Sequence, residues 1–286
     1  MNRLFGWLAV GCVLMAAVPA PAALVFSEDF TGLTNGEVLT TSNTDLTYIR
    51  IGSGGGVINA LAPGNFTGNS PSAIVTQATS GGALNGIGVA NTLPLSDVYE
   101  LSLDFRLTDL TGDVVIGVGA GSAFTGNSTF TGSQGLFWLQ SDSGNFERRT
   151  SGWSNVGGGT ILTVDTDYAL RVLANGSATA VTYPGGSVAA GSMDIYLNGS
   201  LLDDDVPVTT SGLQANGFRI YQVNQGNFEV DNIQLSVVPE PSMILLASIG
   251  GLALGSGLLR RRTQLGCNRR TRTTRSADSA GSAVAW

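Results

Sequence analysis

The segment from Tyr99 to Leu107 places an apolar side chain at every second position, and this alternation constrains the fold more than any other feature of the chain. Its odd-numbered residues are apolar, whereas Glu100, Ser102, Asp104 and Arg106 lie between them. A period of two is typical of a strand with one buried face and one exposed face. We therefore predict a strand over 99–107 whose odd-numbered side chains enter a core.

Shorter segments of the same kind recur between residues 24 and 237, and glycine-rich clusters separate them. No stretch in this interval sustains a period of 3.6 residues, so little helix is expected. A sheet of this many strands has to split or curl to bury its apolar face, which favours an all-β fold, a single antiparallel jelly-roll β-sandwich over 24–237. The other predicted strands cover 46–51, 113–120, 135–140, 168–174, 178–183, 193–198, 217–223 and 228–236.

The last predicted strand changes its parity in the middle. Phe228 and Val230 share one face, but Ile233 and Leu235 fall on the other face of a regular strand. An extra residue near Asp231 would bring all four apolar side chains to the same side. The sequence therefore predicts a bulge or a change of partner at 231–232.

Four segments resemble parts of concanavalin-A-like, laminin-G-type jelly rolls. In such folds the first and last strands lie side by side, so the resemblance implies that the strand near 27–30 pairs with the strand near 230–233. The segments are Ser27-Glu28-Asp29-Phe30, Asp167-Tyr168-Ala169-Leu170-Arg171-Val172, the hairpin-like Met193-Asp194-Ile195-Tyr196-Leu197-Asn198-Gly199, and Val230-Asp231-Asn232-Ile233.

The N-terminal residues have the organisation of a secretory signal peptide. Arg3 precedes an apolar stretch over 4–18, and the small residues of 20–23 follow. We predict a signal helix within residues 1–23, with cleavage near Ala22 or Ala23. The mature chain would then begin close to Leu24.

The C-terminal region contains an uncharged apolar run from Met243 to Leu259, bounded by prolines before it and arginines after it. At about 1.5 Å per helical residue, this run is long enough for a transmembrane helix. The positive-inside rule keeps Arg3 and the arginines after the run in the cytoplasm and places the segment between the two helices outside. The flanking residues are Val238, Pro239, Glu240 and Pro241 before the run and Arg260, Arg261 and Arg262 after it.

This order of parts over 238–262 resembles the PEP-CTERM sorting signal of exported bacterial proteins. The resemblance implies an exosortase-type processing enzyme as a partner, transient anchorage in the inner membrane, and then a cell-surface or extracellular protein associated with exopolysaccharide. The alternative is a plain C-terminal anchor. An Arg-rich tail over 263–286, expected to be disordered, departs from the family pattern. It is either a cytoplasmic extension or sequence that the true reading frame lacks.

Composition excludes several kinds of chemistry. The chain has no histidine, all 14 of its basic residues are arginines, and its two cysteines, Cys12 and Cys267, lie outside 24–237. A Ser-His-Asp hydrolase, a histidine zinc site, a Schiff-base enzyme and thiol catalysis are thereby excluded from the exported domain. With 6 arginines and 19 carboxylates, the segment carries a formal charge of −13 and is not expected to bind nucleic acid.

A glycosidase is a distant alternative for the function, because laminarinase-type enzymes share the concanavalin-A-like fold. Their strand motif Glu-x-Asp-x-x-Glu is absent. Glu100 and Asp104 share a strand face but would lie about 13 Å apart, too far for either hydrolytic geometry. Asp165 and Asp167 precede a strand, where aspartates commonly cap turns. We therefore predict no catalytic residue.

Two kinds of binding residue are candidates. Aspartate and asparagine beside turns suit Ca²⁺, the one candidate cofactor, although no spacing matches an EF-hand. Aromatic side chains on the face opposite their apolar neighbours suit glycans. The function we expect is a non-catalytic surface or matrix protein, with a carbohydrate-binding, lectin-like module as the alternative. The calcium candidates are Asp109 with Asp113, Asp142 with Asn145, and Asp203-Asp204-Asp205; the aromatic candidates are Trp138, Trp153 and Tyr196.

Overall fold

The computed structural model describes residues 22–53, 55–66, 70–79, 84–125, 132–184 and 186–238. These residues belong to one compact unit that extends from Pro19 to Glu240. The predicted signal peptide up to residue 21, the sorting signal from Pro239 to Arg262 and the tail over 263–286 lie outside the described residues. Within the described ranges, no helix combines the length and the hydropathy needed to cross a bilayer.

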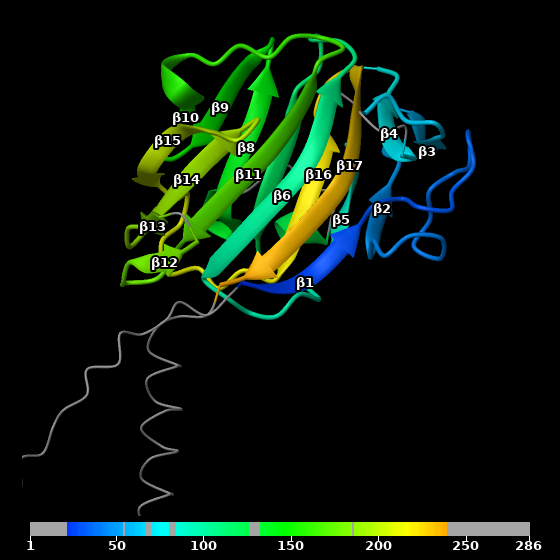
Figure 1. Ribbon diagram of the computed structural model, residues 1–286. Helices are drawn as coiled ribbons and strands as arrows, with labels where there is room; N and C mark the ends of the chain where they lie inside the picture. The colour runs from blue at the N-terminus through cyan, green and yellow to red at the C-terminus, as the bar shows by residue number, and fades with distance from the viewer. Residues whose placement is uncertain are drawn as a thin grey trace, which may run out of the picture. The chain divides into compact units, whose positions relative to one another are not determined.

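The described part of the chain is all-β, as predicted, and its ladders are antiparallel (Figure 1). An eight-stranded sheet, hereafter sheet A, has the order β15 (Ser200–Pro207), β14 (Ser192–Leu197), β11 (Asp167–Asn175), β6 (Val98–Leu107), β17 (Gly226–Val237), β4 (Ser72–Gln77) and β3 (Gly56–Leu61), and β1 (Ala23–Glu28) also pairs with β17. A seven-stranded sheet, sheet B, has the order β10 (Trp153–Asn155), β9 (Asn145–Arg149), β8 (Gly135–Asp142), β7 (Val114–Gly119), β16 (Gly217–Gln222), β5 (Asn85–Val89) and β2 (Tyr48–Arg50). A separate hairpin joins β12 (Val181–Tyr183) to β13 (Gly186–Val188).

The two sheets form a sandwich around one main core. In β6 the predicted alternation is confirmed: the side chains of Tyr99, Leu101, Leu103, Phe105 and Leu107 are buried, whereas the even-numbered ones from Glu100 to Arg106 are partly exposed. The core cluster that contains them also takes side chains from the strands of sheet B. The even-numbered residues of β6 therefore lie on the outer face of sheet A.

The two predictions made for the last strand are confirmed. β1 lies beside β17, with Glu28 opposite Ile233 and Ser27 opposite Gln234. The ladder between β17 and β6 shifts its register between Asp231 and Gln234, and Asn232 has a φ of 50°. This bulge brings the apolar side chains on both sides of it into the main core.

Several strands lacked a clear signal in the sequence, and some predicted strands are shorter than expected. β3, β4 and β5 contain polar residues or glycine where an alternating pattern would need apolar ones. β15 carries Asp203, Asp204 and Asp205, which are calcium candidates expected beside a turn; they lie instead in the edge strand of sheet A. Charged side chains on an edge strand discourage pairing with another chain.

Candidate functional site

A groove of about 440 Å³ crosses the outer face of sheet A over β17, β6, β11 and β14. A second depression of about 200 Å³ adjoins it, since Asp104 and Ala169 line both. Short side chains account for the hollow, because Ser102 and Ala169 lie between longer neighbours on adjacent strands. We call the two depressions together the sheet A groove. Its remaining lining residues are Leu103, Leu170, Arg171, Tyr196, Gly199, Asn232 and Gln234 in the larger part and Phe66, Asp167, Tyr168 and Asn198 in the smaller part.

Strand register sets the order of polar groups across the groove. Gln234 of β17 lies opposite Ser102 of β6, Ser102 lies opposite Arg171 of β11, and Arg171 lies opposite Tyr196 of β14. Two residues further along β6, Asp104 lies opposite Ala169 of β11. Four strands thus place an amide, a hydroxyl, a guanidinium and a phenol in a single row.

Arg171 is fixed by partners on both sides. Its Nε lies 2.7 Å from Oε1 of Glu100, and its guanidinium lies 5.2 Å from the ring centroid of Tyr196 and 5.4 Å from that of Tyr183. Burial by itself lowers the pKa of Arg171, but the hydrogen bond and charge of Glu100 outweigh burial and raise it. The guanidinium therefore stays charged and can act as a hydrogen-bond donor in the groove.

Tyr196 is held by a hydrogen-bond network at the β14 side of the groove. The hydroxyls of Tyr183 and Tyr196 lie 2.7 Å apart, and Tyr183 also donates to Oδ2 of Asp194 at 2.8 Å. Asp194 is almost fully buried and accepts a second hydrogen bond from the backbone N–H of Asp205. Burial, followed by these hydrogen bonds, raises the pKa of Tyr183. Tyr183 therefore remains a protonated phenol that donates its one hydrogen bond to Asp194 and accepts one from Tyr196.

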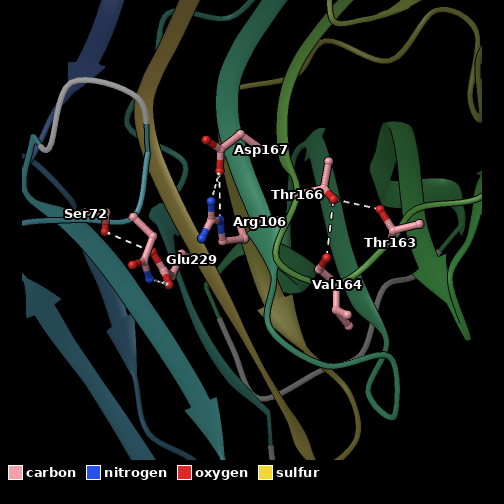
Figure 2. A network of polar contacts seen from close by, with 8 residues as sticks. Ser72, Arg106, Thr163, Val164, Thr166, Asp167 and Glu229 are labelled. Atoms are coloured by element: carbon pink, nitrogen blue, oxygen red, sulfur yellow. Dashed lines mark hydrogen bonds and ion pairs between the residues drawn. The ribbon is translucent and has the colours of Figure 1, made fainter.

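The smaller part of the groove is bordered by an ion pair. Arg106 contacts Oδ1 of Asp167 at 2.7 Å through Nη2 and at 2.8 Å through Nε, as Figure 2 shows. Asp165, which we considered together with Asp167, lies in a turn with a φ of 55°, and its backbone N–H donates to the carbonyl of Leu107. The two aspartates therefore lie in different settings, Asp165 in a turn and Asp167 in an ion pair at the start of β11.

The bulge in β17 brings polar side chains to the groove at its junction. Nδ2 of Asn232 donates a hydrogen bond of 2.8 Å to Oδ2 of Asp104. Asp231 lies directly opposite Asp104, is fully buried, and accepts a hydrogen bond of 2.6 Å from Ser70. The nearby Glu229 is also buried and accepts hydrogen bonds from Asn65 and Ser72 (Figure 2). Sequence reasoning missed Asp104 and Asn232 as binding residues, although the parity change at 231–232 marked the place.

The three aromatic candidates are not brought together. Tyr196 lies in the groove, but Trp153 belongs to β10 of sheet B, where the guanidinium of Arg149 lies 5.4 Å from its ring centroid. Trp138 faces away from Phe137 and Leu139, as predicted, yet the expectation that its ring is exposed is wrong because the side chain is fully buried.

The ring of Trp138 is covered by side chains from other strands and from a turn. It stacks on Phe124, at the end of the short 3-10 turn Ser122–Phe124, with ring centroids 5.0 Å apart. Together with Val115 and Tyr221 it forms a second apolar cluster outside sheet B. Trp138 is therefore a packing residue and not part of a glycan site.

The calcium candidates are engaged in protein hydrogen bonds. Asp109 accepts from Thr111 and from the backbone N–H of Asn227, and Asp113 accepts from Asn224. Asp142 and Asn145 face each other across the β8–β9 ladder. Among the described residues, no group of three or more acidic side chains is placed to hold a metal ion. Calcium binding stays a prediction.

Asp113 allows a test of stability against pH. Burial is the main cause that raises its pKa, and the neighbouring charge of Asp142 adds to it. A carboxyl with a raised folded-state pKa stabilises the fold below its ordinary pKa, and this contribution is lost as the pH rises through the raised value. Asp113→Asn removes the charge, so we expect the variant to melt higher than the parent at pH 8 and not at pH 4.

The expected difference at pH 8 is about 2–4 °C, equivalent to about 1 kcal/mol or less because the side chain is partly screened by water. Thermal melts at both pH values measure it. A melting temperature of Asp113→Asn below that of the parent at pH 8 would show that the charged form of Asp113 is needed for the fold.

The class defined by these observations is an antiparallel β-sandwich with a polar groove on the outer face of one sheet. No protein-family model matches the chain, and no curated protein matches it in sequence. Solved structures with a similar chain path include a sialidase at 11% identity and a TM-score of 0.48, which matches 78% of this chain and 19% of its own. The chain thus spans about a fifth of that sialidase.

Two smaller proteins are matched over nearly their whole length. Domain 4 of AbnA, a GH43 extracellular arabinanase from Geobacillus stearothermophilus, is 16% identical with a TM-score of 0.43, covering 78% of this chain and 97% of its own. The alginate lyase Aly36B is 14% identical with a TM-score of 0.45, covering 78% of this chain and 100% of its own. At this distance the matches identify neither a family nor an activity.

Proposed function

We propose that the protein is an exported, non-catalytic jelly-roll module that binds a carbohydrate chain in the sheet A groove. The observation that carries this proposal is the row of Gln234, Ser102, Arg171 and Tyr196 across four adjacent strands. Sugar hydroxyls need donors and acceptors in fixed positions, and a sugar ring packs against an aromatic side chain. The row offers both kinds of contact at one surface.

The size of the groove favours an oligosaccharide over a free monosaccharide. Its larger part, about 440 Å³, falls in the range of roughly 300–1,000 Å³ typical of ligand pockets, and the smaller part of about 200 Å³ extends it. Glu100 holds Arg171 in place in the groove, and Arg106 holds Asp167 in place at its border. Side chains that are ordered before the ligand arrives lose less entropy on binding.

We propose that the protein binds the glycan and does not catalyse a reaction on it. Arg171, which lines the groove, is held by Glu100, and Tyr183 next to it stays protonated, so this tyrosine is a poor general base. Glu100 and Asp104, four residues apart on β6, are too widely separated for the paired-carboxylate mechanism. Release of reducing sugar ends from a glycan by the purified protein would contradict the proposed absence of catalysis.

The cellular setting belongs to the proposal as well. The signal peptide of 1–23 and the signal over 238–262 would export the domain, present its C-terminal region to an exosortase-type enzyme, and leave the module among exopolysaccharides. Intact-mass analysis of the cell-bound and released protein gives both processed ends. Protein that keeps residues 263–286 in cells with the processing enzyme would instead favour the plain anchor.

Tyr196 provides the first test of the binding site. Tyr196→Ala removes the phenol ring and its contact with Arg171, so we expect affinity for a bound glycan to fall about tenfold. A polysaccharide panel scored by affinity electrophoresis identifies the glycan, and calorimetry then measures the change.

Trp153→Ala supplies the matched control for this test. It also removes an aromatic ring that lies near an arginine, but it does so in sheet B, away from the groove. We expect it to leave the affinity within about twofold of the parent value, since Trp153 does not line the groove. Equal losses in the two variants would place the binding site elsewhere.

A further inference from the structure

The groove contains one carboxylate that no arginine neutralises. Arg171 pairs with Glu100 and Arg106 pairs with Asp167, each at 2.7 Å. Among the described residues the remaining ion pair joins Arg148 to Asp203, so Asp104 takes part in none. Its side chain is half-buried and lines both parts of the groove.

Within the described residues, Asp104 has a single side-chain hydrogen-bond partner, so its carboxylate can accept further hydrogen bonds. Nδ2 of Asn232 donates to Oδ2 at 2.8 Å. An ionised carboxylate accepts about four hydrogen bonds. A ligand group placed at the junction of the two depressions could therefore donate to Asp104 and take the place of water.

A buried acid lies beside Asp104 at the junction. Asp231, fully buried, lies opposite Asp104 on the neighbouring strand, and its pKa is raised by burial first and then by the charges of Asp104 and Asp29. Asp231 and the buried Glu229 receive hydrogen bonds from neutral groups, namely Ser70, Asn65 and Ser72. Arg106 lies opposite Glu229 and pairs with Asp167, so within the described residues Asp104 at the junction has no cationic partner.

We propose that the groove selects a glycan that carries protonated amino groups, such as a glucosamine polymer, with an ammonium group bound by Asp104. This proposal rests on the glycan-binding role proposed above. An ammonium group has three N–H donors and a full positive charge, which match an accepting carboxylate in a negative setting. A neutral glycan satisfies the hydroxyl contacts of the row but gains nothing from the charge. A uronate polymer would be repelled.

The test compares three oligosaccharides of equal length: fully deacetylated glucosamine, its N-acetylated counterpart, and a uronate oligomer. Calorimetry with the full chain in detergent, at a mildly acidic pH that keeps the amines protonated, measures each affinity. We expect the deacetylated oligomer to bind about fivefold more tightly than the acetylated one, as one accessible ion pair allows. The difference should shrink as salt is added, because salt screens exposed charges.

Asp104→Asn removes the charge and keeps the shape, so it should abolish the preference for the deacetylated oligomer and the salt dependence of that preference. Asp45→Asn, which removes a charge from an exposed loop outside the groove, should preserve the preference. Equal binding of amino and acetylated oligomers by the parent, or an unchanged preference in Asp104→Asn, overturns the amino-sugar inference and leaves the glycan-binding proposal intact. Failure of every oligomer and polysaccharide to bind overturns both.

Discussion

Replacing Gly117 by alanine is expected to destabilise the β-sandwich by about 3 kcal/mol, the upper range for overpacking a buried site. Gly117 lies on the outer face of β7, and the ring of Trp138 lies directly over it, so an added Cβ would overlap the ring carbons Cε3 and Cζ3. The ring cannot move aside freely. It stacks on Phe124 with an interplanar angle of 15° and meets Tyr221 edge-on at 6.4 Å.

A double-mutant cycle identifies the clash as the cause. In a Trp138→Leu background the overlapping ring is gone, so Gly117→Ala should cost close to nothing, which gives a coupling energy of about 2–3 kcal/mol. Urea denaturation of the four proteins measures the cycle. Gly152→Ala is the control, because no atom lies within 4 Å of the added methyl group and the expected change is within about 0.5 kcal/mol. Additive effects at Gly117 and Trp138 would contradict the packing argument.

The sequence predicts the parts of the fold whose signal is local. The alternation over Tyr99–Leu107 and the parity change at 231–232 each depend on neighbours within one strand, and both are confirmed. β15 is missed because an edge strand needs no apolar face, so its aspartates resemble a loop. Strand parity also places Trp138 correctly on the outer face of sheet B.

The burial of Trp138 could not be deduced from its own strand. What covers the ring is Phe124, supplied by a turn whose position depends on the tertiary fold. One signal was present in the sequence: Gly117 and Gly135 both lie in predicted strands, and a glycine within a strand often marks the close approach of another group. A Cβ at either position would overlap Trp138.

The candidate groove depends on pairings between distant segments. Tyr196 was identified by parity alone, but Ser102 and Gln234 become neighbours only because β6 pairs with β17, more than 100 residues later in the chain. Asp104 likewise has no arginine partner because Arg106 pairs with Asp167 and Arg171 pairs with Glu100. The composition shows that carboxylates outnumber arginines, and the strand register determines which carboxylate lies unpaired in the groove.

Filling the groove at Ala169 should abolish glycan binding, at least about a hundredfold, which is the largest functional effect that we expect. Ala169 lines both depressions and its side chain is exposed. It lies opposite Asp104 of β6, and its backbone N–H donates to Asn198 in the turn after β14. Ala169→Trp would place a large ring where the sugar lies. Tryptophan suits an exposed strand position, so the melting temperature should change little.

Ser154→Trp is the matched control for the filled groove, because it places the same ring on an exposed strand position of sheet B. It should bind the glycan like the parent, and Ala169→Trp should fail to bind while unfolding at the same urea concentration. Since the two substitutions add the same apolar area, a difference between them can arise only from where the ring lies. Retained binding in Ala169→Trp would rule out the groove as the glycan site, whatever happens at Tyr196.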